Sequence, residues 1–580
     1  MSKQKQQPKQ QATSSTSFSW IVYTAVLFIS SFALYWHTGS FPYTENDDTI
    51  FIRETEAYNK GDNYARSFKR GVFMDSTDTY YRPMLLNSFV WDRHREGKTT
   101  TALHANVDAP DDISQYHQTN VLLHVVSVLL LFFLLRLLLQ NDTYAFILAF
   151  MFAMHPALVQ AVAWIPGRND SLLAVFTFGF LISATLYVRS GNHLYNALQI
   201  LLLLAALFTK ETGIIVAAVA VLVFTLMQRI PVRDKRLWIL AAGWILAIAV
   251  WFYFRMNATV KSQDLTPDIL ISTFIHRLPI LLQYFGKILL PFNLCVFPWQ
   301  EDTTLWFGVA AVVLIAVGIA LAPRKDWRVI ATGAAWFVLF ILPALIVPKT
   351  LNNEIYEHRL YIPLVGVLLL LTQTYPFQKI KEQYLLYGGV ALCVVLGVYS
   401  YQRCELFSGK YQYWENAVAN APSSPYAKVM LGARYYRDKV NPQKDKGYQT
   451  LMDAYAIDPK QKYLNYYLGL VMIDRNDWTK AEEYFNREVA PDPAIRGDMY
   501  QNLARGYIER KLFAQAEPYM LKWLATDPLN GTANTNLLLL YINDYKQPEK
   551  ARAHAEQMLK KGLTVPNELL RAVGLPENKQ

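Results

Sequence analysis

The sequence predicts an all-α protein in two parts, a helical domain that crosses a membrane many times and a stack of helical repeats. Apolar runs of near bilayer-spanning length recur up to about residue 401, in a chain of 580 residues that is 53% hydrophobic. Beyond that point the sequence turns polar, and prolines recur about every 34 residues. We expect a disordered cytosolic tail over residues 1–17, a membrane domain over 18–402 and a repeat domain over 403–580.

The apolar runs predict about eleven membrane spans, because a span needs about 20 apolar residues. The stretch 271–290 is apolar but contains His276, Arg277 and Lys287, so we expect it to be an interfacial helix. The expected spans lie near residues 18–36, 119–139, 144–163, 171–188, 194–208, 213–228, 238–255, 304–322, 329–347, 361–374 and 385–401.

Basic residues in the short loops predict the orientation of these spans. The short loops 189–193, 228–236, 324–328 and 379–381 fall on one side of these spans, and all but the first are clearly basic, which marks cytosolic loops. The N-terminus is then cytosolic, while the long first loop, 37–117, and everything after about 402 lie on the outer side. One miscounted span would invert all that follows it.

The net charge of +10 resembles that of a nucleic-acid-binding protein, but much of it lies beside apolar runs. We therefore expect no nucleic-acid partner. The cysteines, Cys295, Cys393 and Cys404, have neither metal-ligand nor redox spacing. The sequence indicates no firm cofactor, and whether a divalent cation assists the carboxylates stays open.

The C-terminal prolines, Pro459, Pro493 and Pro528, each follow an aspartate at spacings of 34 and 35 residues. This period is typical of tetratricopeptide (TPR) repeats, in which helix pairs stack into a solenoid. We expect the solenoid to engage a peptide, with oligomerisation or simple support as alternatives. Small and apolar positions repeat as well: Leu468, Gly469, Ala481 and Phe485 are followed one repeat later by Leu503, Ala504, Ala516 and Met520.

Two adjacent carboxylates, Asp47 and Asp48, lie about ten residues beyond the first span. A carboxylate at a membrane face can take the proton of an acceptor hydroxyl while a sugar–phosphate bond breaks. Taken alone, the pair is explained more simply by a solvated loop or a helix cap.

Further polar residues are expected on the same side of the membrane. Because charged side chains near lipid are energetically unfavourable, their presence there indicates a function. Arg and Lys suit a phosphate or pyrophosphate group, and Arg can bind it with two hydrogen bonds. A satisfied buried histidine, an interfacial ion pair or a snorkelling arginine would account for individual members. The candidates for donor binding are Arg82, His117, His155, Arg168, Asp170, Lys210, Glu211, His358, Arg359 and Tyr361.

In their order, these stretches resemble the transmembrane-and-tetratricopeptide-repeat O-mannosyltransferases, a GT-C type membrane glycosyltransferase family. The likeness covers nearly the whole chain, and its combination of motifs is more specific than any one of them. We expect a bacterial member. The matching stretches are Asp47-Asp48, Tyr81-Arg82-Pro83-Met84, Tyr116 to Asn120, Leu123-His124, Phe152 to Pro156, Ala161 to Trp164, Gly167 to Asp170, Lys210 to Gly213 and Arg359 to Pro363.

The resemblance implies an inverting transfer from a polyprenyl-phosphate sugar to Ser or Thr of a protein, with an acidic residue of the first outer loop as base. That role falls on Asp47 or Asp48, and we favour Asp47. Gln160 stands where the family usually has Glu, and the first loop holds extra polar sequence around residues 97–112. The donor is therefore open between mannose, another sugar and a lipid-linked oligosaccharide.

We expect an enzyme of the bacterial inner membrane with periplasmic repeats, the ER membrane with luminal repeats being the alternative. Its expected function is glycosylation of secreted or periplasmic proteins. Transfer of sugar to a lipid or a surface polysaccharide, and a non-catalytic membrane scaffold, are the competing hypotheses.

Overall fold

The computed structural model describes residues 19–49, 51–52, 63–72, 79–95, 113–259, 266–347, 353–490 and 493–577. These residues are helical, and the described part of the chain contains no strand beyond an isolated bridge between Trp299 and Glu354. The expected disordered tail and the polar stretch 97–112 lie outside the described residues. The chain divides into two compact units, Met1–Ala421 and Pro422–Gln580.

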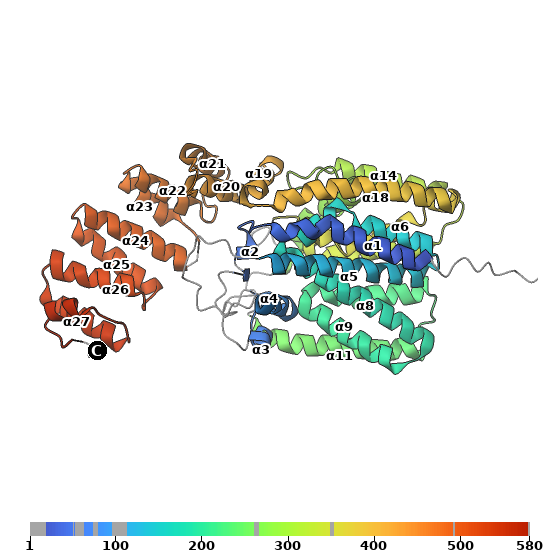
Figure 1. The fold of residues 1–580 in the computed structure, drawn as a ribbon, viewed down its shortest axis with the longest axis horizontal. Coiled ribbons are helices and arrows are strands. Elements are labelled where there is room, and N and C mark those ends of the chain that lie inside the picture. The colour runs from blue at the N-terminus through green and yellow to red at the C-terminus, as the bar shows by residue number, and fades with distance from the viewer. Residues whose placement is uncertain are drawn as a thin grey trace, which may run out of the picture. The chain divides into compact units, whose positions relative to one another are not determined.

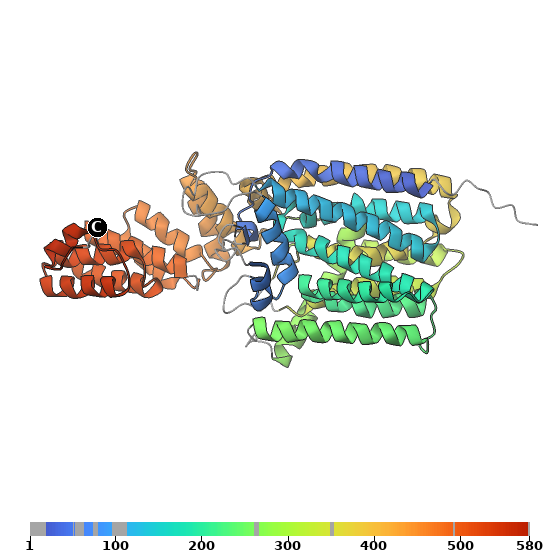
Figure 2. The ribbon, with the colours of Figure 1, turned by 60° about the horizontal axis from the view of Figure 1, so that its bottom comes forward.

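The first unit is a bundle of long apolar helices. Figures 1 and 2 show α1, α5, α8, α9 and α11 running roughly parallel, with α2, α3 and α4 beyond one end of them. The helices are α1 (Ser19–Tyr35), α2 (Asp47–Thr49), α3 (Asn63–Arg66), α4 (Pro83–Arg95), α5 (Ser114–Leu139), α6 (Asp142–Ala153), α7 (Val159–Ala163), α8 (Arg168–Ser190), α9 (His193–Thr209), α10 (Ile214–Leu222), α11 (Lys235–Ala258), α12 (Pro267–Arg277), α13 (Pro279–Leu289), α14 (Trp306–Leu321), α15 (Trp327–Leu345), α16 (Pro363–Leu371), α17 (Tyr375–Lys379), α18 (Glu382–Cys404) and α19 (Lys410–Asn420).

Within the part of the chain that the structure describes, seven stretches are long and apolar enough to cross a membrane, and the bent pair α6–α7 adds an eighth. Three further apolar helices, among them α9 and α14, are shorter than a full span. The chain is therefore a multi-pass membrane protein. The expected eleven spans stay a prediction, since one of them, 361–374, contains only the nine-residue helix α16.

The stretch expected as an interfacial helix, α12–α13, has the length and composition of a span. Two of its charged side chains bind other parts of the bundle: Lys287 binds Glu357 in the turn 357–360, and Arg277 donates to the carbonyl of Ala344, in the last turn of α15, at 3.1 Å. Both charges are buried against protein, and the interfacial position of this stretch stays a prediction.

The two ends of the bundle are marked by separate polar networks. At one end Arg229 binds Asp326 at 3.1 Å and the Arg324 amide donates to the Gln378 side chain at 3.1 Å, so the loops expected to be cytosolic at 228–236, 324–328 and 379–381 lie together. At the other end Arg403, near the end of α18, binds Glu357 at 2.9 Å, close in sequence to Glu354, whose charge acts on Asp47. α18 therefore ends on the side of the candidate site.

Close helix contacts depend on glycine at a few positions. A Cβ on Gly308 of α14 would lie 2.2 Å from the carbonyl oxygen of Leu282, and one on Gly366 of α16 would lie 2.4 Å from that of Gly333. Only a residue without a side chain lets these backbones approach so closely.

The second unit consists of consecutive helix pairs. Buried small residues separate the helices of a pair: Gly432 faces Leu451, and Gly469 faces Phe485. This agrees with the expected spacing, although the assignment as TPR repeats stays a prediction. The helices are α20 (Pro425–Arg437), α21 (Lys444–Ile457), α22 (Leu464–Asp474), α23 (Trp478–Arg487), α24 (Pro493–Glu509), α25 (Phe513–Thr526), α26 (Gly531–Leu539), α27 (Pro548–Lys560) and α28 (Asn567–Ala572).

Candidate active site

The two adjacent carboxylates, Asp47 and Asp48, differ in their surroundings. The Asp48 carboxylate is buried and accepts three hydrogen bonds, from the amide and hydroxyl of Thr44 at 2.6 and 2.9 Å and from the amide of Asn46 at 3.0 Å. These bonds close residues 44–48 into a tight loop, which we call the acid loop. The Asp48 oxygens are thereby committed to holding the loop.

Asp47 keeps part of its surface and accepts no hydrogen bond from the residues that the structure describes. Burial, followed by the nearby charges of Asp48 and Glu354, raises the pKa of Asp47 to about 6, and Arg82 partly opposes this. A carboxylate with a raised pKa is a stronger base when ionised, and at neutral pH it is largely ionised. Asp47 therefore has the properties of a general base, and Asp48 those of a structural carboxylate.

A second group of charges surrounds Asp170, at the start of α8. Both Asp170 oxygens accept from the Lys210 ammonium at 2.8 Å, and His358 Nε2 lies 3.9 Å from Oδ2. Arg82 and Arg359 also act electrostatically on Asp170. The chain thus brings Arg82, Lys210, His358 and Arg359 around one carboxylate, although they are far apart in the sequence.

Glu211 orients the Arg82 side chain. Its carboxylate accepts from Arg82 Nε at 3.1 Å and from the Tyr81 amide at 2.9 Å, and Arg255 lies 3.4 Å away. A bond through Nε leaves the terminal nitrogens of Arg82 for other acceptors. Glu211 therefore holds an arginine whose charge extends to both Asp47 and Asp170.

The turn of residues 357–360 carries two further candidates. Arg359 is half-buried and donates to the carbonyl of Glu354 at 3.0 Å, while its guanidinium lies 5.7 Å from the ring centre of Tyr356. Burial, with the charges of Lys210 and Arg359 beside it, holds the pKa of His358 well below its usual range. His358 is therefore neutral at pH 7, and it can offer an N–H but no charge.

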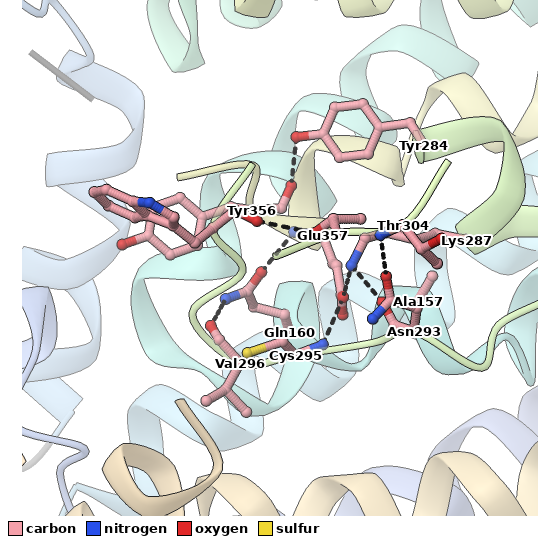
Figure 3. Close-up of polar contacts among 12 residues, drawn as sticks. Ala157, Gln160, Tyr284, Lys287, Asn293, Cys295, Val296, Thr304, Tyr356 and Glu357 are labelled. Carbon is pink, nitrogen blue, oxygen red and sulfur yellow. Dashed lines mark hydrogen bonds and ion pairs between the residues drawn. The ribbon is translucent and has the colours of Figure 1, made fainter. Parts of the chain in front are cut away.

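Gln160 fixes this turn from below (Figure 3). Its carbonyl oxygen accepts from the backbone amides of Glu357 at 2.9 Å and His358 at 3.1 Å, and its amide group donates to the carbonyl of Val296 at 2.8 Å. A glutamate here could accept both amides but could not donate to Val296 when ionised. Gln160 therefore acts through its amide, and any acidic role at this position is absent in this chain.

Glu357 anchors the same turn in a buried ion cluster. Its carboxylate accepts from Lys287 at 2.7 Å, from Arg403 at 2.9 Å and from the Cys295 amide at 2.8 Å, and it has no exposed surface. Figure 3 shows Lys287 and Glu357 meeting between α13 and the turn. The Glu357 carboxylate is therefore occupied by contacts that hold the structure together.

Arg168 has contacts of its own, separate from those of the charged residues around Asp170. Its guanidinium has no exposed surface and binds Asp92, the Asn120 side chain and the Tyr116 carbonyl, each at 2.6 Å. These contacts join α4, α5 and α8. They leave the predicted donor-binding role of Arg168 without an accessible donor group.

The remaining candidates are buried. His155 Nε2 donates to the Ile288 carbonyl at 2.7 Å, and its Nδ1 accepts from the Ala157 amide at 3.2 Å. The Tyr361 hydroxyl lies 2.7 Å from His124 Nδ1. His117 is 2% exposed and packs near Phe41. Donor contact by His117, His155 and Tyr361 stays a prediction.

Sequence reasoning missed Glu354, Arg255 and the aromatic pair Tyr413-Trp414. Glu354 acts on Asp47, and Arg255 on Glu211, yet each is a single charge near a predicted span and resembles an ordinary interfacial anchor. No described group of three or more His, Cys, Asp or Glu residues is arranged to hold a metal ion.

No protein-family model matches the chain. The chain is 22% identical over 420 residues to the protein O-mannosyl-transferase F38B6.6 of Caenorhabditis elegans, which covers 68% of this chain and 56% of that protein. It is 38% identical over 105 residues to Tmtc1 of Drosophila melanogaster, covering 17% and 12%. Over 134 residues it is 32% identical to mouse TMTC1, covering 21% and 14%.

The chain therefore spans about half the length of the worm protein, and less of the others. All of these relatives carry the name protein O-mannosyl-transferase. Together with the multi-pass helical fold, the similarity supports a relationship of this chain to the TMTC-like protein O-mannosyltransferases.

Proposed function

We propose that this chain is a GT-C type protein O-glycosyltransferase, which moves a sugar from a polyprenyl-phosphate donor to Ser or Thr hydroxyls. The observation that carries the proposal is the separation of roles at the acid loop. Asp48 is bound on three sides, whereas Asp47 is available, has a raised pKa and lies within the electrostatic reach of Arg82. The names of the relatives support the same reaction class.

In the proposed reaction Asp47 takes the proton of the acceptor hydroxyl as the oxygen attacks the anomeric carbon of the sugar. A new carbon–oxygen bond forms there while the bond to the phosphate oxygen breaks. The polyprenyl phosphate leaves with that electron pair, on the side opposite the attack, so the anomeric configuration inverts. General-base assistance of this kind contributes about 10²- to 10⁴-fold in rate.

The leaving phosphate gains negative charge, and cations that are already in place stabilise it. Arg82 and Arg359 are proposed to meet the phosphate, Arg82 because Glu211 binds only its Nε among the described contacts. Lys210 is held by Asp170, and His358 can donate one neutral hydrogen bond. The carrier is proposed as a monophosphate, with a pyrophosphate-linked oligosaccharide as the alternative.

The helical unit 422–580 is proposed to be a TPR solenoid that engages the acceptor polypeptide on the outer face of the membrane. That face is the periplasm of a bacterial inner membrane or, alternatively, the ER lumen. The three relatives described above come from animals.

The test is glycoproteomics of cells that carry the full chain or its Asp47→Asn variant. The variant should lose at least about 100-fold in transfer, because a carboxamide cannot accept the hydroxyl proton. Asp142→Asn is the matched control, since its carboxylate pairs with Arg136 at the opposite end of the bundle. Wild-type levels of O-linked sugar in the Asp47→Asn strain would refute the assignment.

The same strains separate the competing functions. A sugar transferred to a lipid or polysaccharide would leave the intact masses of secreted proteins unchanged while altering the glycolipids. For a non-catalytic scaffold, replacing both Asp47 and Asp48 by Asn would leave the cellular role intact.

A further inference from the structure

Helix α19 contacts three consecutive residues of the acid loop. It is the last helix of the first unit, and it lies more than 360 residues from that loop in the sequence. The contacts are a hydrogen bond from Trp414 Nε1 to the Thr44 carbonyl at 3.1 Å, an ion pair of Lys410 with Glu45 at 3.3 Å, and a hydrogen bond from Asn46 Nδ2 to the Tyr413 hydroxyl at 3.1 Å.

These contacts hold a backbone that is strained. Glu45 has φ of 56°, a left-handed conformation that residues other than glycine rarely adopt. Strain of this kind persists only where the surroundings determine it, and it concentrates at functional sites. Here the surroundings are α19 on one side and the Asp48 carboxylate on the other. The next residue after the three that α19 contacts is Asp47.

The same helix also holds the segment that supports the cationic turn. The Tyr413 hydroxyl lies 3.3 Å from the Val296 carbonyl, and the Asn416 side chain accepts from the Val296 amide at 3.2 Å. The Val296 carbonyl in turn accepts from Gln160, which binds the backbone amides of residues 357 and 358. A continuous set of hydrogen bonds therefore runs from the acid loop through α19 to the turn that carries His358 and Arg359.

We propose that α19 is a positioning element of the active site, in which Tyr413 and Trp414 set Asp47 at a fixed place relative to the cationic turn. This inference rests on the proposed function. Neither aromatic residue touches a reacting atom in it; both act through the residues beside Asp47.

The rings and the polar atoms of these two residues have separable roles. Both side chains are fully buried, and the Trp414 ring packs against Phe297 at 5.5 Å and Tyr413 at 5.0 Å between ring centres. Tyr413→Phe preserves this packing and removes only the hydroxyl, so it tests positioning with little change in the core. Trp414→Phe removes the indole N–H together with part of the ring volume, so its cavity cost is measured against the same change in a buried control tryptophan.

The test uses the full chain in lipid nanodiscs, with kcat, donor KM and the pH profile of kcat measured for each variant. A small displacement of a catalytic group costs up to about 100-fold in rate, so we expect kcat to fall about 10- to 100-fold. The donor KM should stay within about twofold. The limb of the profile on the acid side should move to lower pH, because a looser loop hydrates Asp47.

The matched controls remove the same groups elsewhere. Tyr144→Phe removes a hydroxyl that donates to the Phe377 carbonyl at the opposite end of the bundle, and Trp244→Phe removes an indole N–H that donates to Gln199. Both should keep the wild-type kcat and pH profile. If Tyr413→Phe and Trp414→Phe also keep them, or lose activity only in proportion to folded protein with an unmoved acid limb, the inference is wrong.

Amide hydrogen exchange of residues 44–48 provides a readout that does not depend on transferase activity. The Thr44 and Asn46 amides are bound by Asp48, and they should exchange faster in Tyr413→Phe and Trp414→Phe than in the two controls. If the wild-type chain is inactive but the variants show this faster exchange, the proposed function is wrong and the role of α19 in holding the loop stands. Unchanged exchange would overturn the role of α19 itself.

Discussion

The side chains of the candidate site divide into those that are available and those that are committed. Asp47, Arg82 and Arg359 each keep a functional group that the described contacts leave available, whereas Asp48 and Glu357 are saturated. Neighbouring residues in the sequence thus differ in role, Asp47 from Asp48 and Glu357 from Arg359. Local sequence cannot make this distinction, because it depends on which distant groups contact each oxygen or nitrogen.

The raised pKa of Asp47 predicts an acid limb in the activity profile. In the proposed reaction the ionised carboxylate is the base, so kcat should rise with pH through about 6 and level off above it. The pH dependence of single-turnover transfer, measured between pH 4.5 and 8, checks this. A profile without an acid limb over this range would contradict a base with the raised pKa of Asp47.

The same shift predicts that Asp47 lowers the stability of the fold at neutral pH. Because the folded-state pKa lies above the unfolded one, the folded protein loses stability as pH rises from about 4 to about 6, and the loss persists above that. Asp47→Asn should therefore raise Tm at pH 7.5, with the gain shrinking below pH 6. Thermal unfolding in nanodiscs at several pH values measures it. An equal Tm at pH 7.5 would contradict this.

Arg168 offers a test of a structural role against the role in donor binding expected from the sequence. Removing its charge leaves Asp92 buried and unpaired, which costs about 3–5 kcal/mol. Arg168→Met should therefore unfold more easily, and Arg168→Met/Asp92→Asn should recover part of the loss with an unchanged donor KM. Arg229→Met, which breaks the more exposed pair with Asp326, should cost less than about 1 kcal/mol. A raised donor KM in the double variant would favour phosphate contact.

At the scale of helices, apolar patterning located the bundle correctly, but packing decided what each helix does. α12–α13 passes as a span by composition, yet its Arg277 binds the last turn of α15 and its Lys287 binds Glu357 in the turn 357–360. α19 begins only a few residues after α18, and its buried Tyr413 and Trp414 reach back to the first loop. For this reason the first unit extends to Ala421, beyond the expected boundary at 402.

The contact between α13 and α14 makes a prediction about glycine. A methyl group on Gly308 would overlap the Leu282 carbonyl, so Gly308→Ala should cost about 1–3 kcal/mol and disturb the segment that holds Lys287. Gly388 of α18 has open space around it, and Gly388→Ala should be neutral or slightly stabilising. Thermal unfolding of both variants provides the comparison. Equal stability would show that α13 and α14 pack less closely.

At the scale of the whole molecule, the proposal requires the acid loop and the second unit to face the same compartment. Val440 of the second unit is 94% exposed, and Ser190 is the exposed last residue of α8, in the stretch 189–193 that is expected to be cytosolic. In sealed vesicles of cellular orientation, an impermeant maleimide should label Val440→Cys at once and Ser190→Cys only after permeabilisation. The three native cysteines are buried, so background labelling is low. The reverse pattern would place the solenoid in the cytosol.

The sequence by itself determined the properties that depend on composition along the chain. The helical class follows from apolar runs of a given length and the repeat spacing from the recurring prolines, because both patterns lie in neighbouring residues. The basic loops predict an orientation in the same way. The sequence also identified Asp47, Arg82, Lys210 and Arg359 as candidate site residues.

Only the tertiary structure decided which of these candidates share one site and which are committed elsewhere. Arg168 is bound by Asp92, Asp48 closes the acid loop, and α19 joins that loop to the turn through Val296 and Gln160. The physical reason is that a charge or an amide acquires its function from the groups within hydrogen-bonding distance. Those groups come from parts of the chain separated by tens to hundreds of residues, and only folding brings them together.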